Sequence, residues 1–325
     1  MKKFLIKILI FVLPVIAGAY GIDKILSETL KRSGNYAEGE YPVWNAVFSG
    51  EACSDILIYG SSRALFHIDP AVIDSLLDMS AYNLGINGHT FMLEYYRHEL
   101  LIEQGCEPEL LIQTLDATTL VKGDNLYNPD QFLPYMLNND HMKEIALSFN
   151  GYSDYDFRIP LVRYFGKKEA FLEFWKLLLF PSFNYSLRTK GYRGNEKEWT
   201  DDLEEAKKQF GSYTVQPDSS LLNLFRDFLD ECREENRKVI LVYTPEYIEG
   251  QSFVINRDEV MDLYKDISKE YNIPLLDYSK DEISKNIDYF YNTTHLNKEG
   301  SRLFTRMLFN DILKRGIIKQ AEPGN

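Results

Sequence analysis

The sequence predicts an α/β fold: a three-layer α/β/α domain with a central parallel sheet of five strands. Two observations lead to this prediction. Five short apolar runs, each with the length and composition of a strand buried on both faces, recur along the chain. Segments with apolar residues at helical spacing separate most of them, which is the order of a βαβ repeat. Five strands connected in this way match the flavodoxin-like arrangement.

The first predicted strand covers residues 56–60 and ends in the small-residue turn Gly60-Ser61-Ser62. Asp69 and Pro70 follow, an N-cap residue and a proline suited to the first helical position, so a helix is predicted over 71–77. Two hydroxyl groups therefore stand at the carboxyl end of a buried strand, where open α/β sheets bind their ligands. Taken alone, the same residues are also a common tight turn.

Four further strands follow in chain order. They are predicted over residues 81–84, 110–116, 238–245 and 273–277. The helices between and after them are predicted over residues 91–104, 221–229, 260–271 and 303–312.

The alternation breaks between the third and fourth strands, over about 118–213. This part is dense in Tyr, Phe and Trp, and its most apolar stretch, residues 170–180, predicts a helix that is buried by packing. We therefore expect a helical insertion that covers part of the sheet. A lid over the site is the second interpretation.

The amino terminus carries a membrane signal. Lys2 and Lys3 precede an apolar segment from Phe4 to Ile22, interrupted only by Lys7 and close to the roughly 20 residues that span a bilayer. It predicts an amino-terminal transmembrane helix, or signal anchor, over 1–24. A cleaved signal peptide, cut near residues 17–19, is the alternative. Either interpretation places the rest of the chain on the extracytoplasmic side, in the periplasm or at the cell surface.

The remaining boundaries follow from composition. Mixed charge with Gly34, Gly39 and Pro42 predicts a stalk over 25–50. The α/β/α domain is expected over 51–318, followed by a tail over 319–325.

Charge and cysteine content exclude several classes of protein. With 36 basic and 49 acidic residues, the net charge of −13 argues against a nucleic-acid partner. Cys53, Cys106 and Cys232 are widely spaced, without a Cys-x-x-Cys pair or a histidine at zinc-ligand spacing. We therefore expect core or surface thiols, with neither a zinc site nor a disulfide framework, and no metal or other cofactor.

A late motif, Asn-Thr-Thr-His-Leu-Asn-Lys-Glu-Gly over 292–300, contains a candidate base. Asn297 is a good N-cap, so His295 lies beside a helix start, whose partial positive charge keeps an imidazole neutral and basic. A surface or capping histidine is the ordinary alternative. The order of strand-Gly-Ser-Ser, then Asn-x-Gly-x-x-Gly, then a late His-Leu-Asn is harder to obtain by chance.

Three blocks of the chain resemble those of the SGNH, or GDSL-type, hydrolase superfamily. Gly60-Ser61-Ser62-Arg63 is similar to the first block, which implies that Ser62 is the nucleophile. Residues 83–88 are similar to the second block, which implies that Gly88, with Asn87 beside it, binds the oxyanion or substrate. Residues 292–295 resemble the last block, Asp-x-x-His, which implies that His295 is the base.

The Gly-Ser-Ser opening and the His-Leu-Asn-x-x-Gly ending are nearer to the membrane-anchored branch of that superfamily. That branch includes the D-alanine transfer protein of teichoic-acid synthesis and acetylation proteins of exopolysaccharides. The resemblance implies an acyl esterase or O-acyl(acetyl)transferase that acts on a cell-envelope or exported polysaccharide by a Ser-His mechanism. It also implies an acylated glycan or acyl-donor substrate, and a membrane-bound O-acyltransferase as partner. A catalytically degenerate glycan-binding or scaffold protein of a polysaccharide-modification complex is the alternative.

The chain departs from the superfamily pattern in its third block. Asp116 stands where the pattern has an asparagine that donates to the oxyanion. Loss of one such donor costs about 2.7–4 kcal/mol of transition-state stabilisation. We therefore expect slow turnover or another donor, either Thr118 or the backbone of Ser62.

The second departure is Asn292, where the pattern has the aspartate of the triad. Such a change costs about 10⁴-fold when the amide holds the wrong imidazole tautomer, whereas a carbonyl oxygen that faces the ring still orients it. Asn292 with Ser62 and His295 is one arrangement. A Ser-His dyad, or a triad rebuilt with Asp288 or Asp277, are the others.

Overall fold

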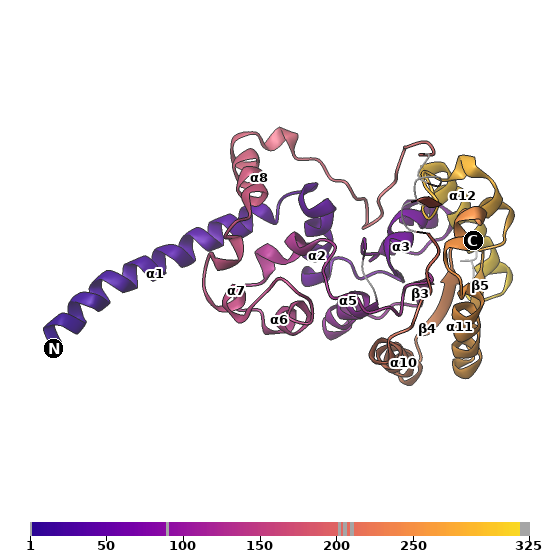
Figure 1. The fold of residues 1–325 in the computed structure, drawn as a ribbon, viewed down its shortest axis with the longest axis horizontal. Helices are drawn as coiled ribbons and strands as arrows, with labels where there is room; N and C mark the ends of the chain where they lie inside the picture. The colour runs from indigo at the N-terminus through magenta and orange to yellow at the C-terminus, as the bar shows by residue number, and fades with distance from the viewer. Residues whose placement is uncertain (1, 89–90, 201–202, 204–206, 209–210, 319–325) are drawn as a thin grey trace, which may run out of the picture. The chain divides into compact units, whose positions relative to one another are not determined.

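The computed structural model describes residues 2–88, 91–200, 203, 207–208 and 211–318 (Figure 1). The chain divides into two compact units. The first comprises Met1–Asn45 with Asp124–Leu187, and the second comprises Ala46–Gly123 with Arg188–Asn325. The second unit contains the sheet and all of the site residues that the sequence predicts.

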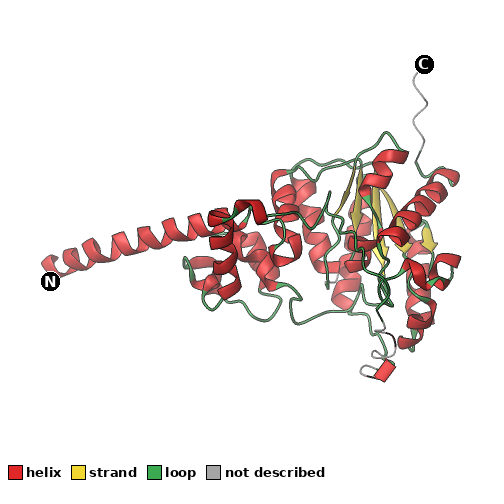
Figure 2. Cartoon of the chain, turned by 90° about the horizontal axis from the view of Figure 1, so that it is seen from above, coloured by secondary structure: helices red, strands yellow, loops and turns green. Residues whose placement is uncertain are grey.

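The second unit is built on one five-stranded sheet in the order β2-β1-β3-β4-β5, with every neighbouring pair parallel. Helices flank the strands, which are yellow in Figure 2. The strands are β1 (Ile56–Tyr59), β2 (Ala81–Asn83), β3 (Leu110–Leu115), β4 (Lys238–Tyr243) and β5 (Leu275–Asp277). The predicted α/β class and the five parallel strands are confirmed, and the order is the flavodoxin-like one. The order reverses between β1 and β3, and such a switch point is where this architecture binds ligands.

Alternate residues of the buried strands supply the cores of two helical layers. Ile56 and Ile58 of β1 belong to the core that also contains Phe304 and Leu308. Tyr59 points the other way, with its ring 6.5 Å from that of Phe228. The helices of this unit are α3 (Ser62–His67), α4 (Pro70–Leu76), α5 (Phe91–Glu103), α10 (Ser219–Glu234), α11 (Arg257–Tyr271), α12 (Lys298–Lys314), and the 3-10 helices η5 (Ile248–Phe253), η6 (Glu282–Lys285) and η7 (Ile287–Tyr289).

The first unit is helical. Its elements are α1 (Lys2–Leu30), η1 (Tyr36–Gly39), η2 (Pro129–Tyr135), α6 (Asp140–Ala146), α7 (Asp154–Arg158), η3 (Val162–Tyr164), α8 (Lys168–Leu179) and η4 (Pro181–Phe183), and α2 (Glu40–Ser49) begins in it. Helix α1 is long and apolar enough to cross a membrane, and its apolar part is exposed. The predicted helical insertion between the third and fourth strands is present as the segment that holds α6, α7 and α8.

Residues 25–50, for which the sequence predicts a stalk, are mostly helical in the structure. Helix α1 continues to Leu30, and Tyr41 and Trp44 of α2 are fully buried. The Trp44 ring lies 5.6 Å from that of Phe132, and its indole N–H donates to Gln131. These partners come from the insertion, about ninety positions away along the chain, so local composition gives no sign of the packing.

The predicted burial of the helix over residues 170–180 is also wrong in part. Helix α8 was expected to be buried by packing, but Phe171, Leu172, Trp175, Leu178 and Leu179 on one of its faces are exposed. The apolar composition correctly predicts that this segment is a helix, but it does not predict whether the apolar face is buried or exposed.

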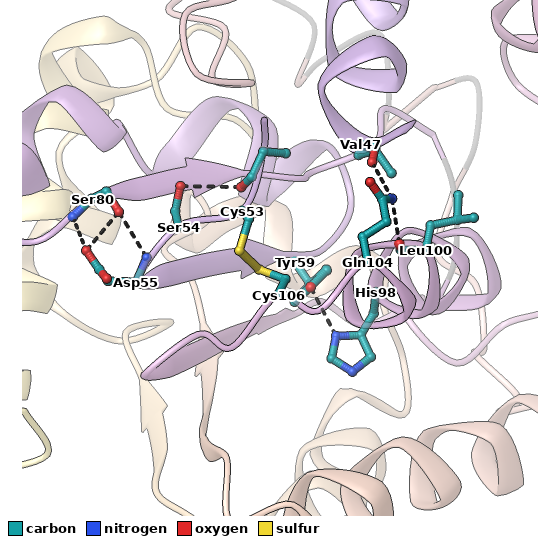
Figure 3. The surroundings of a disulfide bond; sticks show 11 residues. Val47, Cys53, Ser54, Asp55, Tyr59, Ser80, His98, Leu100, Gln104 and Cys106 are labelled. Atoms are coloured by element: carbon teal, nitrogen blue, oxygen red, sulfur yellow. Dashed lines mark hydrogen bonds between the residues drawn. A yellow bond between two sulfur atoms is a disulfide. The ribbon is translucent and has the colours of Figure 1, made fainter. Parts of the chain in front are cut away.

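Cys53 and Cys106 form a disulfide bond, so the expectation of unpaired thiols is wrong for these two (Figure 3). Cys53 lies just before β1 and Cys106 just before β3, and these strands are parallel neighbours. The sheet therefore brings together two cysteines that are 53 positions apart in the sequence. Cys232 is a free, buried thiol, as expected.

Candidate active site

The structure brings Ser62 and His295 together at the carboxyl end of the sheet. Ser62 is the first residue of α3, just beyond β1, and His295 lies in the segment before α12. Nε2 of His295 is 2.8 Å from Oγ of Ser62, and its Nδ1 is 3.0 Å from Oδ1 of Asn292. Three residues that the sequence predicts as catalytic thus form one hydrogen-bonded chain.

The turn that presents Ser62 depends on a glycine. Gly60 has a φ of 145°, and a Cβ at this position would collide with the hydroxyl of Thr114. The sequence predicts only a turn here, but α3 begins at once, because the Ser61 hydroxyl accepts from the backbone N–H of Arg63 and caps the helix. As the first helical residue, Ser62 has a backbone N–H without an intrahelical acceptor.

The surroundings of Asn292 assign its amide orientation. Its Oδ1 accepts from the backbone N–H of His295 at 2.9 Å and of Thr294 at 3.1 Å, and both of these groups are obligatory donors. The amide oxygen therefore faces Nδ1 of His295, which carries the proton, and Nε2 is left to accept from Ser62. This is the tautomer that a general base requires.

No carboxylate takes the place of Asn292 within the part of the chain that the structure describes. The ring nitrogens of His295 hydrogen-bond to Ser62, Asn292 and Thr294. The two aspartates that the sequence offers as substitutes bond elsewhere: Asp277 Oδ1 accepts from the backbone of Ser279, and the side chain of Asp288 is exposed. The arrangement is therefore a Ser-His-Asn relay.

The environment of His295 keeps its ring neutral. Desolvation, and secondly the nearby guanidinium of Arg63, lower the pKa of His295 to about 3, while the charge of Asp116 acts in the opposite direction. The imidazole stacks on the ring of Tyr291, with ring centres 5.4 Å apart, and meets the edge of Phe66. At neutral pH the ring is thus an unprotonated acceptor held in one orientation.

Asp116 lies beside the serine turn and acts there as an acceptor. Its Oδ2 accepts from the hydroxyl of Ser61 at 2.5 Å, and its Oδ1 accepts from the backbone N–H and the hydroxyl of Thr118 at 2.7 and 2.8 Å. These bonds hold the turn and commit both donors of Thr118. Of the two substitute donors that the sequence suggests, the backbone N–H of Ser62 is the one that remains.

Asn87 and Gly88 lie on the loop that leaves β2. The loop continues the sheet beside the serine turn, because Ile86 N–H donates to the carbonyl of Gly60 at 3.0 Å. Gly88 follows two residues later, with a φ of 67°. The same loop is tied to α3 by Asn83, whose side-chain amide donates to the carbonyls of Ala64 and Ile68 at 2.7 and 2.8 Å.

The sequence analysis missed a buried hydrogen-bond network that joins α3, which carries Ser62, to the segment that carries His295. Arg63 Nε donates to Thr244 Oγ1 at 3.0 Å, and its Nη1 pairs with Glu246 at 3.1 Å. His67 Nδ1 is 2.9 Å from the same Thr244 oxygen, and its Nε2 accepts from the backbone N–H of Leu296. Because Leu296 follows the candidate base, the network fixes that segment against α3. Thr244 directly follows β4, so the rule that sites lie at strand ends could have found it.

A pocket of about 280 Å³ lies beside Ser62. Its described lining includes Tyr213, Thr293 and the two arginines that share Glu246, namely Arg63 and Arg257. Since Glu246 pairs with both cations, the pocket offers less positive charge than its arginines suggest. The pocket adjoins the nucleophilic hydroxyl and is large enough to hold an acyl group.

Neither a family model nor a curated protein matches the sequence. Among solved structures, an acetyl-xylooligosaccharide esterase from Geobacillus stearothermophilus shares 15% identity over 80% of this chain and 94% of its own, with a TM-score of 0.40. The acetyl xylan esterase AlAXEase shares 12% over 79% of this chain and 100% of its own, with a TM-score of 0.38. A protein from Desulfitobacterium hafniense, assigned to the G-D-S-L lipolytic family, shares 12% identity over 79% of this chain and 98% of its own. Its TM-score is also 0.38.

Proposed function

We propose that the second unit is a serine acyl esterase or O-acyltransferase for short acyl groups. The observation that carries the proposal is the relay from Ser62 Oγ to His295 Nε2 at 2.8 Å and from His295 Nδ1 to Asn292 Oδ1 at 3.0 Å. A neutral imidazole between a hydroxyl and a fixed acceptor is the arrangement that activates a serine nucleophile. The pocket of about 280 Å³ beside the serine provides room for the acyl group, and the resemblance of the sequence motifs favours acetyl.

In the proposed reaction, Ser62 Oγ bonds to the acyl carbonyl carbon as its proton passes to Nε2 of His295. The carbonyl oxygen becomes an oxyanion, which the backbone N–H groups of Ser62 and Gly88 stabilise. When the tetrahedral intermediate collapses, the leaving alcohol takes the proton from His295. Water, or an acceptor hydroxyl in a transferase, then gives its proton to His295 and attacks the acyl-serine. When this second tetrahedral intermediate collapses, the bond to Ser62 Oγ breaks and Oγ takes the proton back from His295.

The proposed location is the extracytoplasmic side of a membrane. Helix α1 supports a membrane anchor. The disulfide between Cys53 and Cys106 supports an oxidising compartment, because disulfides are rare in the cytosol, where thiols are kept reduced. A protein held there would meet envelope or exported polysaccharides, the acceptor or donor that the sequence motifs suggest. A membrane-bound O-acyltransferase partner that supplies the acyl group fits the same setting.

The test uses the full chain in detergent with paired chromogenic acetyl and octanoyl esters. We expect hydrolysis of the acetyl ester and loss of nearly all activity in Ser62→Ala, and the ratio of the two ester rates measures the acyl length that the pocket accepts. Ser61→Ala is the matched control, since it removes the neighbouring hydroxyl, and it should retain measurable turnover. A fluorophosphonate probe should label the wild type but not Ser62→Ala.

Two outcomes would count against the proposal. Equal activity in the wild type and Ser62→Ala would remove the mechanism. A wild type that neither turns over nor accepts the fluorophosphonate would favour the degenerate glycan-binding alternative. Mass spectrometry of products formed with an added oligosaccharide separates transfer from hydrolysis.

A further inference from the structure

Helix α8 in the first unit buries Ala170, Glu173 and Leu177 and leaves a second, largely apolar face exposed. The face turned to the protein carries Glu173, which accepts from the Ser33 hydroxyl at 2.6 Å, and Lys176, which donates to Asn35 at 3.2 Å. The opposite face is apolar and exposed. It consists of Phe171, Leu172, Trp175, Leu178 and Leu179. A surface helix normally buries its apolar stripe, so this face lacks its natural solvent or partner.

Further large apolar side chains are exposed on either side of α8 in the sequence. Phe180 and Phe183 follow the helix and are both exposed, and Phe165 shortly before it is 93% exposed. Single exposed apolar residues are ordinary, but a contiguous patch of large ones marks an interaction surface. We use the name α8 patch for residues 165, 171, 172, 175, 178, 179, 180 and 183.

Helix α8 lies beside the end of α1 that packs into the first unit (Figure 1). Along α1, the residues before Asp23 are almost all exposed, whereas Asp23 is buried in an ion pair with Arg163 at 2.6 Å. Helices α1 and α8 are in contact. Arg163 is only two residues from Phe165, so the patch begins beside the point at which α1 stops being exposed.

We propose that the α8 patch lies in the interfacial layer of the lipid bilayer that α1 crosses. If the apolar part of α1 spans the hydrocarbon core, the membrane surface lies within about one helical turn of Asp23, a distance of about 5.4 Å along the axis. The patch starts at that level, so lipid that surrounds α1 also reaches it. Tryptophan and other aromatic side chains are enriched at this depth, where an apolar helix face is half immersed.

This continuity with α1 favours lipid over the other occupants of an apolar face. A second copy of the chain or a separate protein would have to displace lipid from the base of the anchor. The inference rests on the proposed membrane anchor but not on the chemistry of Ser62, because the patch and the serine belong to different units of the chain. The two proposals can therefore fail separately.

Trp175 provides a direct test, since it is 55% exposed, whereas Trp44 is fully buried and Trp199 is partly buried. The full chain is reconstituted into phosphatidylcholine and phosphatidylglycerol vesicles at less than one copy per vesicle. Tryptophan emission is then compared between plain lipid and lipid brominated at the headgroup end of the acyl chain. We expect the brominated lipid to quench the wild type and Trp199→Phe, and we expect most of this quenching to be lost in Trp175→Phe.

A second variant keeps the test decisive if Trp175→Phe alters the local fold. Phe165→Trp in the Trp175→Phe background should restore quenching, because it returns a tryptophan to the other end of the same patch. Absence of quenching in the wild type, or equal quenching in the wild type and Trp175→Phe, overturns the proposal. Cross-linking of two copies through the patch, together with absence of lipid quenching, would show that the occupant is a second chain.

Discussion

Substitution of Asn292 by aspartate tests the relay most sharply. In the structure, the amide oxygen of Asn292 already faces Nδ1 of His295 at 3.0 Å and is held there by two backbone N–H groups. Aspartate has nearly the same shape and can accept the same bonds. The substitution therefore adds a negative charge beside the ring without requiring a new tautomer.

The size of the effect follows from this geometry. A hydrogen bond to a charged group contributes about 1.5–3 kcal/mol, compared with about 0.5–1.5 kcal/mol for a neutral one. The difference, about 1–2 kcal/mol, applies to the imidazolium that forms in the transition state, so kcat/KM should rise about 5- to 30-fold in Asn292→Asp. The same charge should raise the pKa of His295 by about one unit.

The assay is acetyl-ester hydrolysis over a range of pH, with Asp288→Asn as the control, which should leave the rate unchanged because that side chain is exposed. If the amide nitrogen of Asn292 faced the ring instead, the wild type would hold the wrong tautomer. In that case the carboxylate of Asn292→Asp would raise kcat/KM by about 10⁴-fold. A gain of that size, or a loss of activity, would refute the assigned orientation.

Three further outcomes are expected. In the wild type, kcat/KM should rise with pH through the lowered pKa of His295 and be level by about pH 6.5, because only the neutral ring accepts a proton; an inflection clearly above 6.5 in the pH profile would contradict this assignment. Reduction of the Cys53–Cys106 bond opens a loop of 53 positions and should lower the free energy of unfolding by about 4 kcal/mol; a urea midpoint that is unchanged by dithiothreitol would contradict this. Gly60→Ala drives a methyl group against Thr114 in a backbone conformation that favours glycine. The substitution should lower the free energy of unfolding, measured by urea denaturation, by about 1–3 kcal/mol and remove most of the esterase activity. An active, fully stable variant would show that the turn tolerates a side chain.

The sequence by itself determined the features that depend on neighbouring residues. Runs of buried-strand composition and helical stripes between them predicted the five parallel strands, because side-chain periodicity is a local property. Local patterns also singled out Ser62 after the first strand and His295 before the last helix. The structure places these two side chains in hydrogen-bond contact.

Tertiary structure decided what depends on distant partners. The pairing of Cys53 with Cys106 required β1 and β3 to be neighbours, and burial of Trp44 required residues from the insertion. The tautomer of His295 follows from which atom of Asn292 the backbone amides hold, and no sequence pattern specifies that. Helix α8 was predictable as a helix, but which of its faces is buried depends on contacts with distant residues, such as those of Glu173 with Ser33 and of Lys176 with Asn35. Most of these contacts join residues that only folding brings together, and the contact of Asn292 depends on which atom of its side chain faces the ring. The local spacing of residues in the sequence specifies neither.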